Sequence, residues 1–422
     1  MQLDSFSIQR KQKYSTFKWL TMLFMFLYIS TIYYLSYSTK YNIISKVLFV
    51  GLLILTFLRL IVENKRIRLD WVGFSLILFL IWVLITNIWV VSGSGVKEFT
   101  RTLAQLVLLF FVIRLNINSE KDFRVVLWAM FVGTVVMCLY TVSIYGIKGV
   151  VSLLSTGGRL GKEVNQANIM GLYCDILCVM SLYFIYWEKK KWAYAVLVLS
   201  VFTLIGTGSR RSFLIAALLF FILFVFKKEK GRLKRALIVL GIVGALVYMI
   251  FKLAETNIYF FRISQTFEIF NDNEDVLTDG SILTRLSFFE LAFELFLQKP
   301  LFGHGSVQFE YYYSIRTGFR RPPHSTFMQV LVGYGLLGFC IFYGMYVYSL
   351  IKLVPMVLAK RKYSIMILTM ALVMLVSDIG TNMLNGKMTY IMLAIYTAYI
   401  SIKLDDELLP KGEENEKSIR GV

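Results

Sequence analysis

The residue types best suited to chemistry gather in the stretch 298–339. It holds both histidines of the chain, His304 and His324, and a short basic run: Arg316, Arg320 and Arg321. An apolar run begins directly after His324. A guanidinium stays charged and can bond two phosphate oxygens at once, and an imidazole can take a proton from a hydroxyl near neutral pH. The stretch therefore predicts a site for an anionic, lipid-linked substrate at the mouth of a membrane helix.

Other polar residues stand near the ends of other apolar runs. Arg210 and Arg211 occupy a turn so short that both must stay at helix ends, where placing them costs free energy. Asp378 closes a later run and is interpreted as a sugar contact or as a helix cap. His324 is the predicted base, although an interfacial or capping histidine would occupy the same place. His304 stands between two glycines and is predicted to be a turn residue.

Composition sets the fold class. Hydrophobic residues make up 57% of the 422 residues, against about 45–50% in a typical soluble domain. Repeated apolar runs of about twenty residues predict an all-α polytopic membrane protein. About twelve transmembrane helices are expected, at 18–38, 43–62, 71–91, 99–115, 122–146, 166–187, 192–208, 212–227, 235–253, 326–351, 363–379 and 387–402.

Charge predicts the orientation of these spans. The formal net charge is +19, and most of the basic residues fall in alternate gaps between spans. Because basic loops stay in the cytoplasm, we expect a multi-pass protein of the cytoplasmic membrane with both termini cytoplasmic, and no nucleic-acid partner. The expected divisions are 1–253 with nine spans, 254–325 as an extracytoplasmic loop with an amphipathic helix over 284–298, 326–404 with three spans, and a tail at 405–422.

Several kinds of site are not expected. The four cysteines all lie in apolar runs and are interpreted as small buried side chains. The acidic stretch 272–274 lies in a polar loop and is interpreted as solvated. Nucleotide-binding, zinc-protease and hydrolase motifs are lacking in the sequence. We therefore expect no metal and no cofactor.

Four segments together resemble the O-antigen ligase and Wzy-type O-antigen and capsular polysaccharide polymerase family. They are G-R-L-G at 158–161 followed by N-Q-A-N at 165–168, G-T-G-S-R-R-S at 206–212, T-R at 284–285 followed by K-P-L-F-G-H-G at 299–305, and H-S-T-F-M-Q-V-L-V-G-Y-G-L-L-G at 324–338. Ser325 stands where the family usually has asparagine. The resemblance covers roughly 155–340.

The resemblance implies a GT-C-like, metal-independent, inverting glycosyltransferase that uses undecaprenyl diphosphate donors. Its functional residues map to Arg210, Arg285 and His324. Charge and position add Arg211, Arg320 and Arg321 as ligands of the donor diphosphate. Further candidate substrate contacts are Arg159, Asn168, Arg316 and Asp378.

The resulting prediction is a polysaccharide polymerase that joins lipid-linked oligosaccharide repeats, as in capsule or exopolysaccharide synthesis. Its partners would be undecaprenyl-diphosphate-linked oligosaccharide, membrane lipid and other polysaccharide-assembly proteins. A ligase that transfers polymer to a different acceptor is the first alternative. A transporter or flippase of lipid-linked sugar is the second, although its ionisable residues would be expected deep in the spans.

Overall fold

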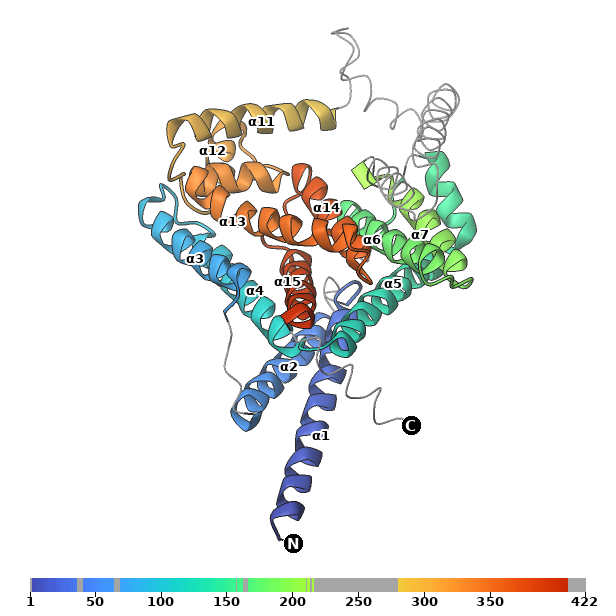
Figure 1. The fold of residues 1–422 in the computed structure, drawn as a ribbon. Helices are drawn as coiled ribbons and strands as arrows, with labels where there is room; N and C mark the ends of the chain where they lie inside the picture. The colour runs from blue at the N-terminus through green and yellow to red at the C-terminus, as the bar shows by residue number, and fades with distance from the viewer. Residues whose placement is uncertain are drawn as a thin grey trace.

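The computed structural model describes residues 2–35, 41–63, 69–156, 158–161, 166–209, 211–212, 215 and 280–408. All regular elements in these ranges are helices, which confirms the all-α prediction (Figure 1). They are α1 (Gln2–Thr31), α2 (Asn42–Glu63), α3 (Trp71–Thr86), the 3-10 turn η1 (Asn87–Trp89), α4 (Val96–Asn116), α5 (Glu120–Thr156), α6 (Ala167–Tyr186), α7 (Ala193–Thr207), α11 (Gly280–Gln298), α12 (Gln308–Thr317), α13 (Thr326–Leu358), α14 (Ser364–Ile379) and α15 (Lys387–Leu408).

Hydropathy explains why these segments are helices. Five are long and apolar enough to cross a membrane, and three shorter helices are also apolar. In lipid a helix satisfies its own backbone hydrogen bonds, so a long apolar run adopts this form. The protein is thus a polytopic membrane protein. Most of the predicted span 212–227 and most of the predicted tail lie outside the described residues, as do all of the predicted span 235–253 and the acidic stretch 272–274.

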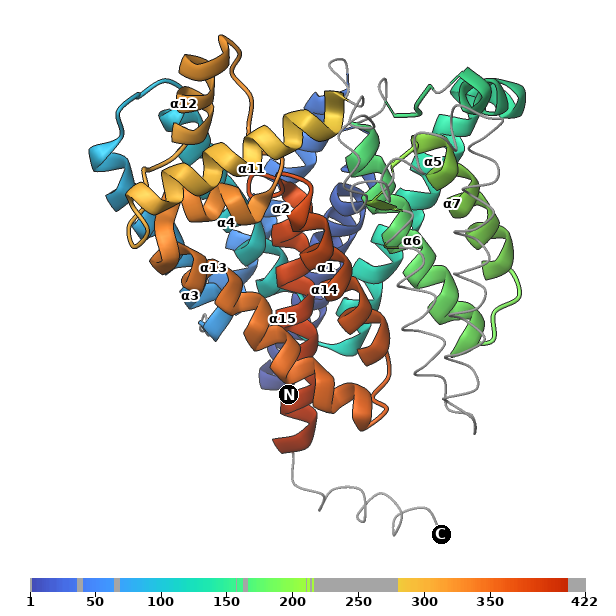
Figure 2. The same cartoon turned by 90° about the horizontal axis from the view of Figure 1, so that it is seen from above.

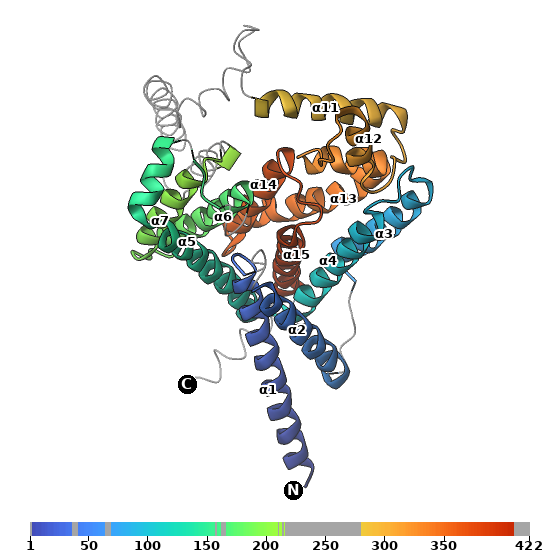
Figure 3. The ribbon, with the colours of Figure 1, turned by 180° about the vertical axis from the view of Figure 1, so that it is seen from behind.

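The helices surround α15. It contacts α4, α5, α13 and α14, while α3 with α4 and α5 with α6 and α7 form two arms on either side (Figure 1). The view from behind shows the same order, with α11 and α12 along the edge opposite α1 and α2 (Figure 3). In Figure 2, α11 and α12 lie at the upper end of the bundle, and the C-terminal part of α15 lies at the lower end. We call the upper end the α11 end.

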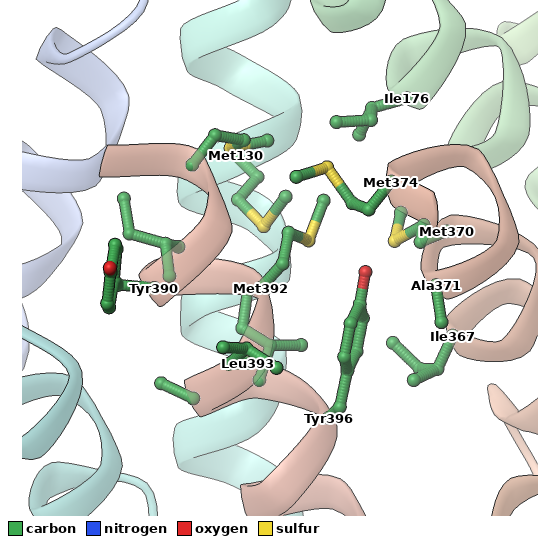
Figure 4. Packing of buried hydrophobic residues seen from close by; sticks show 14 of the residues in the cluster. Met130, Ile176, Ile367, Met370, Ala371, Met374, Tyr390, Met392, Leu393 and Tyr396 are labelled. Carbon is green, nitrogen blue, oxygen red and sulfur yellow. The ribbon is translucent and has the colours of Figure 1, made fainter. Parts of the chain in front are cut away.

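Methionine and tyrosine fill the centre. Met130 of α5, Met370 and Met374 of α14, and Met392 and Tyr396 of α15 point toward one another (Figure 4). All five side chains are fully buried. Unbranched methionine fills irregular gaps between helices that cross at different angles, which suits a bundle whose arms diverge. The prediction that all cysteines are buried is wrong for Cys340, which is exposed on α13 among other exposed apolar side chains of that helix.

Candidate active site

A break in α13 shapes the α11 end. Gly335 has φ 64° and ψ −167°, so it interrupts the helix. The residues after α11 occupy the gap and replace the helical bonds with four backbone hydrogen bonds. These run from His304 N to Val332 O (2.8 Å), Gly305 N to Gly333 O (2.7 Å), Leu336 N to Pro300 O (2.8 Å) and Leu337 N to Leu301 O (3.3 Å). We call 300–305 with 332–337 the glycine junction. It fixes α11 against α13.

His304 belongs to this junction. Its side chain is only 3% exposed, and its Nε2 lies 2.8 Å from the carbonyl oxygen of Leu295 near the end of α11. Gly303 and Gly305 on either side both have positive φ. Burial lowers the pKa of His304, so the ring is neutral near pH 7. His304 thus lies in a turn and ties that turn to α11.

His324 lies at the start of α13. The next residue, Ser325, caps the helix by accepting a hydrogen bond from Met328 N at 3.4 Å, a role that serine and asparagine share. The ring of His324 is 5.5 Å from the ring of Phe288 on α11. His324 itself has φ 52°, a left-handed conformation uncommon outside glycine, asparagine, aspartate and histidine. Such backbone conformations recur at functional sites.

Arg211 lies between α6 and α14. Its Nη1 donates to Ser377 O at 2.9 Å and its Nη2 donates to Asn168 O at 3.0 Å. Gly380, just beyond α14, lies beside it, since a Cβ added there would be in ordinary van der Waals contact with Arg211 Cδ at 3.6 Å. The guanidinium is therefore fixed by two carbonyl groups from helices that are distant in sequence. Burial lowers the pKa of Arg211 to about 10, so it remains a cation at neutral pH.

Arg159 supports this arrangement from the 158–161 segment. Its Nε donates to Thr207 O at 2.8 Å, and its Nη2 donates to Asn168 Oδ1 at 2.7 Å. The backbone of Leu160 also donates to Gly206 O at 2.8 Å. Arg159 and Asn168 thus lie together beside Arg211, as supports of the turn that carries it. Arg210 lies outside the described residues.

The positive charge of Arg285 affects the pKa of both Arg211 and His324. This charge contributes to a lowered pKa of Arg211. For His324, burial is the largest cause of a lowered pKa, followed by the charges of Arg285 and Arg321. These effects require the groups to lie near one another. We call Arg211, Arg285, Arg321 and His324 the arginine–histidine cluster. A neutral imidazole beside several cations could accept a proton from a hydroxyl while the cations bind an anion.

Two predicted arginines point elsewhere. Arg320 donates from Nη1 to Ser94 Oγ at 2.7 Å and from Nη2 to Ser94 O at 2.6 Å, so it contacts the α3–α4 loop. Arg316 pairs with Glu294 of α11 at 3.2 Å, and both side chains are exposed. The structure does not bring either guanidinium into the arginine–histidine cluster.

Two buried acids lie near Arg211. Asp378 is fully buried in α14, and the hydroxyl of Tyr343 donates to its Oδ2 at 3.3 Å. Asp175, in the middle of α6, is also fully buried. The negative charges of Asp175 and Asp378 both act to raise the pKa of Arg211. Sequence reasoning missed Asp175, although an acid within an apolar run was a usable signal. Within the described ranges, no group of three or more His, Cys, Asp or Glu could hold a metal ion.

The fold and this site define a class: a polytopic membrane protein with a cationic, histidine-bearing site at one end of its helices. Residues 195–343 match the family model described as O-Antigen ligase. The match begins in α7 and includes Arg211, Arg285, the glycine junction and His324. It confirms the resemblance that the motifs indicate and implies a membrane enzyme of glycosyltransferase type. No curated protein matches the chain significantly.

Proposed function

We propose that this protein is a polysaccharide polymerase that joins undecaprenyl-diphosphate-linked oligosaccharide repeats at the outer face of the cytoplasmic membrane. The observation that carries the proposal is the arginine–histidine cluster. Its members come from the turn after α7, from α11 and from the segment that leads into α13, and the charge of Arg285 acts on both Arg211 and His324. Cations in a partly dry site bind a diphosphate more strongly than they would in water.

The proposed reaction is one inverting displacement. The sugar hydroxyl of the acceptor attacks the anomeric carbon of the growing chain while the bond from that carbon to the carrier diphosphate breaks. The hydroxyl proton passes to the imidazole of His324. The electron pair of the broken bond stays on the departing diphosphate, whose charge Arg211, Arg285 and Arg321 stabilise. Charge that develops during bond breaking meets fixed cations, which favours the transition state.

The lowered pKa of His324 supports the base role. Below its pKa the imidazole is a cation and cannot accept a proton. Burial and two neighbouring arginines lower that pKa, so the neutral form dominates at neutral pH. A base must be in this form before the reaction begins. Arg159 and Asn168 would act by holding Arg211 in place, and Asp378 by orienting an acceptor sugar.

A ligase is the second candidate, favoured by the description of the matching family. The chemistry would be the same, and only the acceptor would differ. Reconstitution in liposomes with the lipid-linked repeat unit separates the candidates. A ladder of products stepped by one repeat, with carrier diphosphate released, establishes the polymerase. A single addition that requires a different acceptor establishes the ligase, and unchanged substrate on the other side of the bilayer establishes a transporter.

A further inference from the structure

The helix α11 has two apolar faces. Phe288, Leu291, Ala292 and Leu295 are buried and pack against α12 and α13. Leu286, Phe289, Phe293 and Leu297 are exposed, by 43%, 38%, 57% and 59% respectively. We call this second set the apolar stripe. At about 100° per residue the two sets fall on opposite sides of the helix, so the stripe points away from the rest of the protein.

The stripe continues into other exposed apolar surface. Leu301 and Phe302, just after α11, are 53% and 51% exposed. The ring of Phe302 lies 5.8 Å from that of Trp82 on α3, and Leu336 and Leu337 of α13 are also exposed. Both α13 and the continuous run of α3 and η1 are long and apolar enough to span a membrane. Exposed apolar side chains on such helices face lipid, and Leu301 and Phe302, which follow the C-terminal end of the stripe, connect it with that surface.

Residues typical of a membrane interface mark this end of the stripe. A cavity of about 450 Å³ is lined by Trp89 and the segment 298–303, including Lys299. The indole nitrogen of Trp89 donates to Gly303 O at 3.0 Å. Tryptophan and lysine are both favoured at the level of lipid headgroups, because each combines an apolar body with a polar end.

Charges on the two flanks of the stripe orient α11. Glu290 and Glu294 lie on one flank, and Arg316 pairs with Glu294 there in an exposed ion pair. Arg285 lies on the opposite flank, toward Arg211 and His324. A helix that lies in the plane of an interface has water or headgroups on one flank and lipid on its apolar face. The glutamate flank fits the aqueous side, and the Arg285 flank then faces the bundle.

We propose that the apolar stripe of α11 is embedded among phospholipid acyl chains, in the leaflet on the α11 side of the bilayer. The helix would lie parallel to the membrane surface, attached to the bundle by its other apolar face and by the glycine junction. Arg285 would then be held at the level of the lipid phosphates. This inference does not depend on the proposed glycosyl transfer, because it concerns only how the helix meets the membrane.

Photo-crosslinking tests the proposal directly. The full-length protein would carry benzoyl-phenylalanine at Phe293 or Leu297, in liposomes of phosphatidylglycerol and phosphatidylcholine. The matched control places the same group at Glu290, on the aqueous flank. After illumination, mass spectrometry of the α11 peptide should show a phospholipid adduct when the group is at 293 or 297. It should show no such adduct when the group is at 290. Crosslinks from 293 and 297 to another peptide of this chain, or to a second copy, would overturn the proposal.

A second measurement guards against crosslinking that simply fails. Phe293→Cys and Glu290→Cys would be treated with a membrane-impermeant maleimide, with the parent chain run alongside because Cys340 is exposed. In liposomes we expect the cysteine at 290 to be labelled and the cysteine at 293 to remain unlabelled. Both should be labelled after the protein is unfolded in detergent. Equal labelling at the two positions in liposomes would put the stripe in water and disprove its insertion.

Discussion

The α11 end contains two regions that differ in how many of their buried polar groups are hydrogen-bonded. In the glycine junction, four backbone hydrogen bonds replace those that the break at Gly335 removes from α13. In the region around Arg211, Nε of Arg211 and Oδ1 of Asp378 are buried without a hydrogen-bond partner among the described residues. Neither carboxylate oxygen of Asp175 makes a hydrogen bond of good geometry within that part of the chain, although the hydroxyl of Ser212 lies nearby.

This difference in hydrogen bonding suggests that the glycine junction has a structural role and that the region around Arg211 has a chemical one. An unsatisfied buried polar group costs about 1–3 kcal/mol, so a fold that lacked another use for such groups would pair them. The glycine junction pairs its backbone groups in this way and leaves one side-chain atom, His304 Nδ1, without a partner among the described residues, although it carries one of the most recognisable stretches of the sequence. The region around Arg211 brings several buried polar groups together with cations, an arrangement that suits the binding of a polar substrate. The two regions should therefore respond differently to substitution.

The largest effect is expected in the glycine junction, on stability. A Cβ added by Gly303→Ala would lie 2.4 Å from Gly333 O, at a φ of 75°. The left-handed backbone and the overlap together should destabilise the protein by about 2–5 kcal/mol. The thermal unfolding midpoint in detergent and the yield of monodisperse protein would measure the loss.

Gly318→Ala is the matched control for that substitution. Gly318 has nearly the same φ, 78°, but a Cβ there meets no described atom within 4 Å. It should lose only the roughly 1–2 kcal/mol of the backbone conformation. If Gly303→Ala were no worse than Gly318→Ala, the close contact of the two segments in the junction would be wrong.

The next largest effect is expected on activity, at His324. His324→Asn should reduce the rate of glycosyl transfer roughly 10²–10⁴-fold, because the amide cannot act as a general base. Asparagine tolerates the left-handed backbone that His324 adopts, so the unfolding midpoint should stay near that of the parent. Product formation from a lipid-linked repeat, measured beside thermal unfolding, tests both parts. Full activity would remove His324 from the mechanism.

Most of the helices and several of the candidate site residues could be predicted from the sequence. Apolar runs located the helices because hydropathy is a local property of the chain. Arg211 and His324 were found because charged and polar residues at the ends of such runs are conspicuous. Arg285 was reached through the family resemblance. These predictions depend on residue type and short spacing, which the sequence displays directly.

Long-range partners could not be predicted in the same way. The hydrogen bonds between 300–305 and 332–337 join backbone groups, whose pairing leaves little trace in hydropathy beyond the glycines themselves. Arg320 contacts Ser94, which is 226 positions away, and nothing in the basic run distinguishes it from Arg321. The placement of Asp175 beside Arg211 likewise depends on how α6 packs. Sequence patterns suggest which residues can act, and packing decides which of them meet.

A smaller effect on activity is expected at Arg211. Arg211→Lys keeps the charge but loses the fork that reaches Ser377 O and Asn168 O together. Because lysine is a single point donor, the rate should fall roughly 10- to 100-fold, with a modest loss of stability. Arg316→Lys is the control, since its exposed pair with Glu294 should contribute at most about 1 kcal/mol. Equal rates in the two variants would argue against a role for Arg211 in the reaction.

The smallest and most specific effect concerns the pH profile. The charge of Arg321 lowers the pKa of His324, so Arg321→Ala should raise that pKa toward the ordinary value of about 6.5. Because the imidazole must be neutral to accept a proton, activity falls as the pH drops through this pKa. In Arg321→Ala the fall should therefore begin at a higher pH than in the parent.

The shape of that profile is informative even if the rate of the variant changes. Arg321 is itself a proposed diphosphate ligand, so each profile is normalised to its own maximum before comparison. Arg320→Ala serves as the control, because Arg320 is a neighbour in sequence whose guanidinium is bound to Ser94. Its normalised profile should match that of the parent. A shift in Arg320→Ala, or none in Arg321→Ala, would mean that the acidic limb reports a group other than His324. The proton of the acceptor hydroxyl would then have to leave by another route.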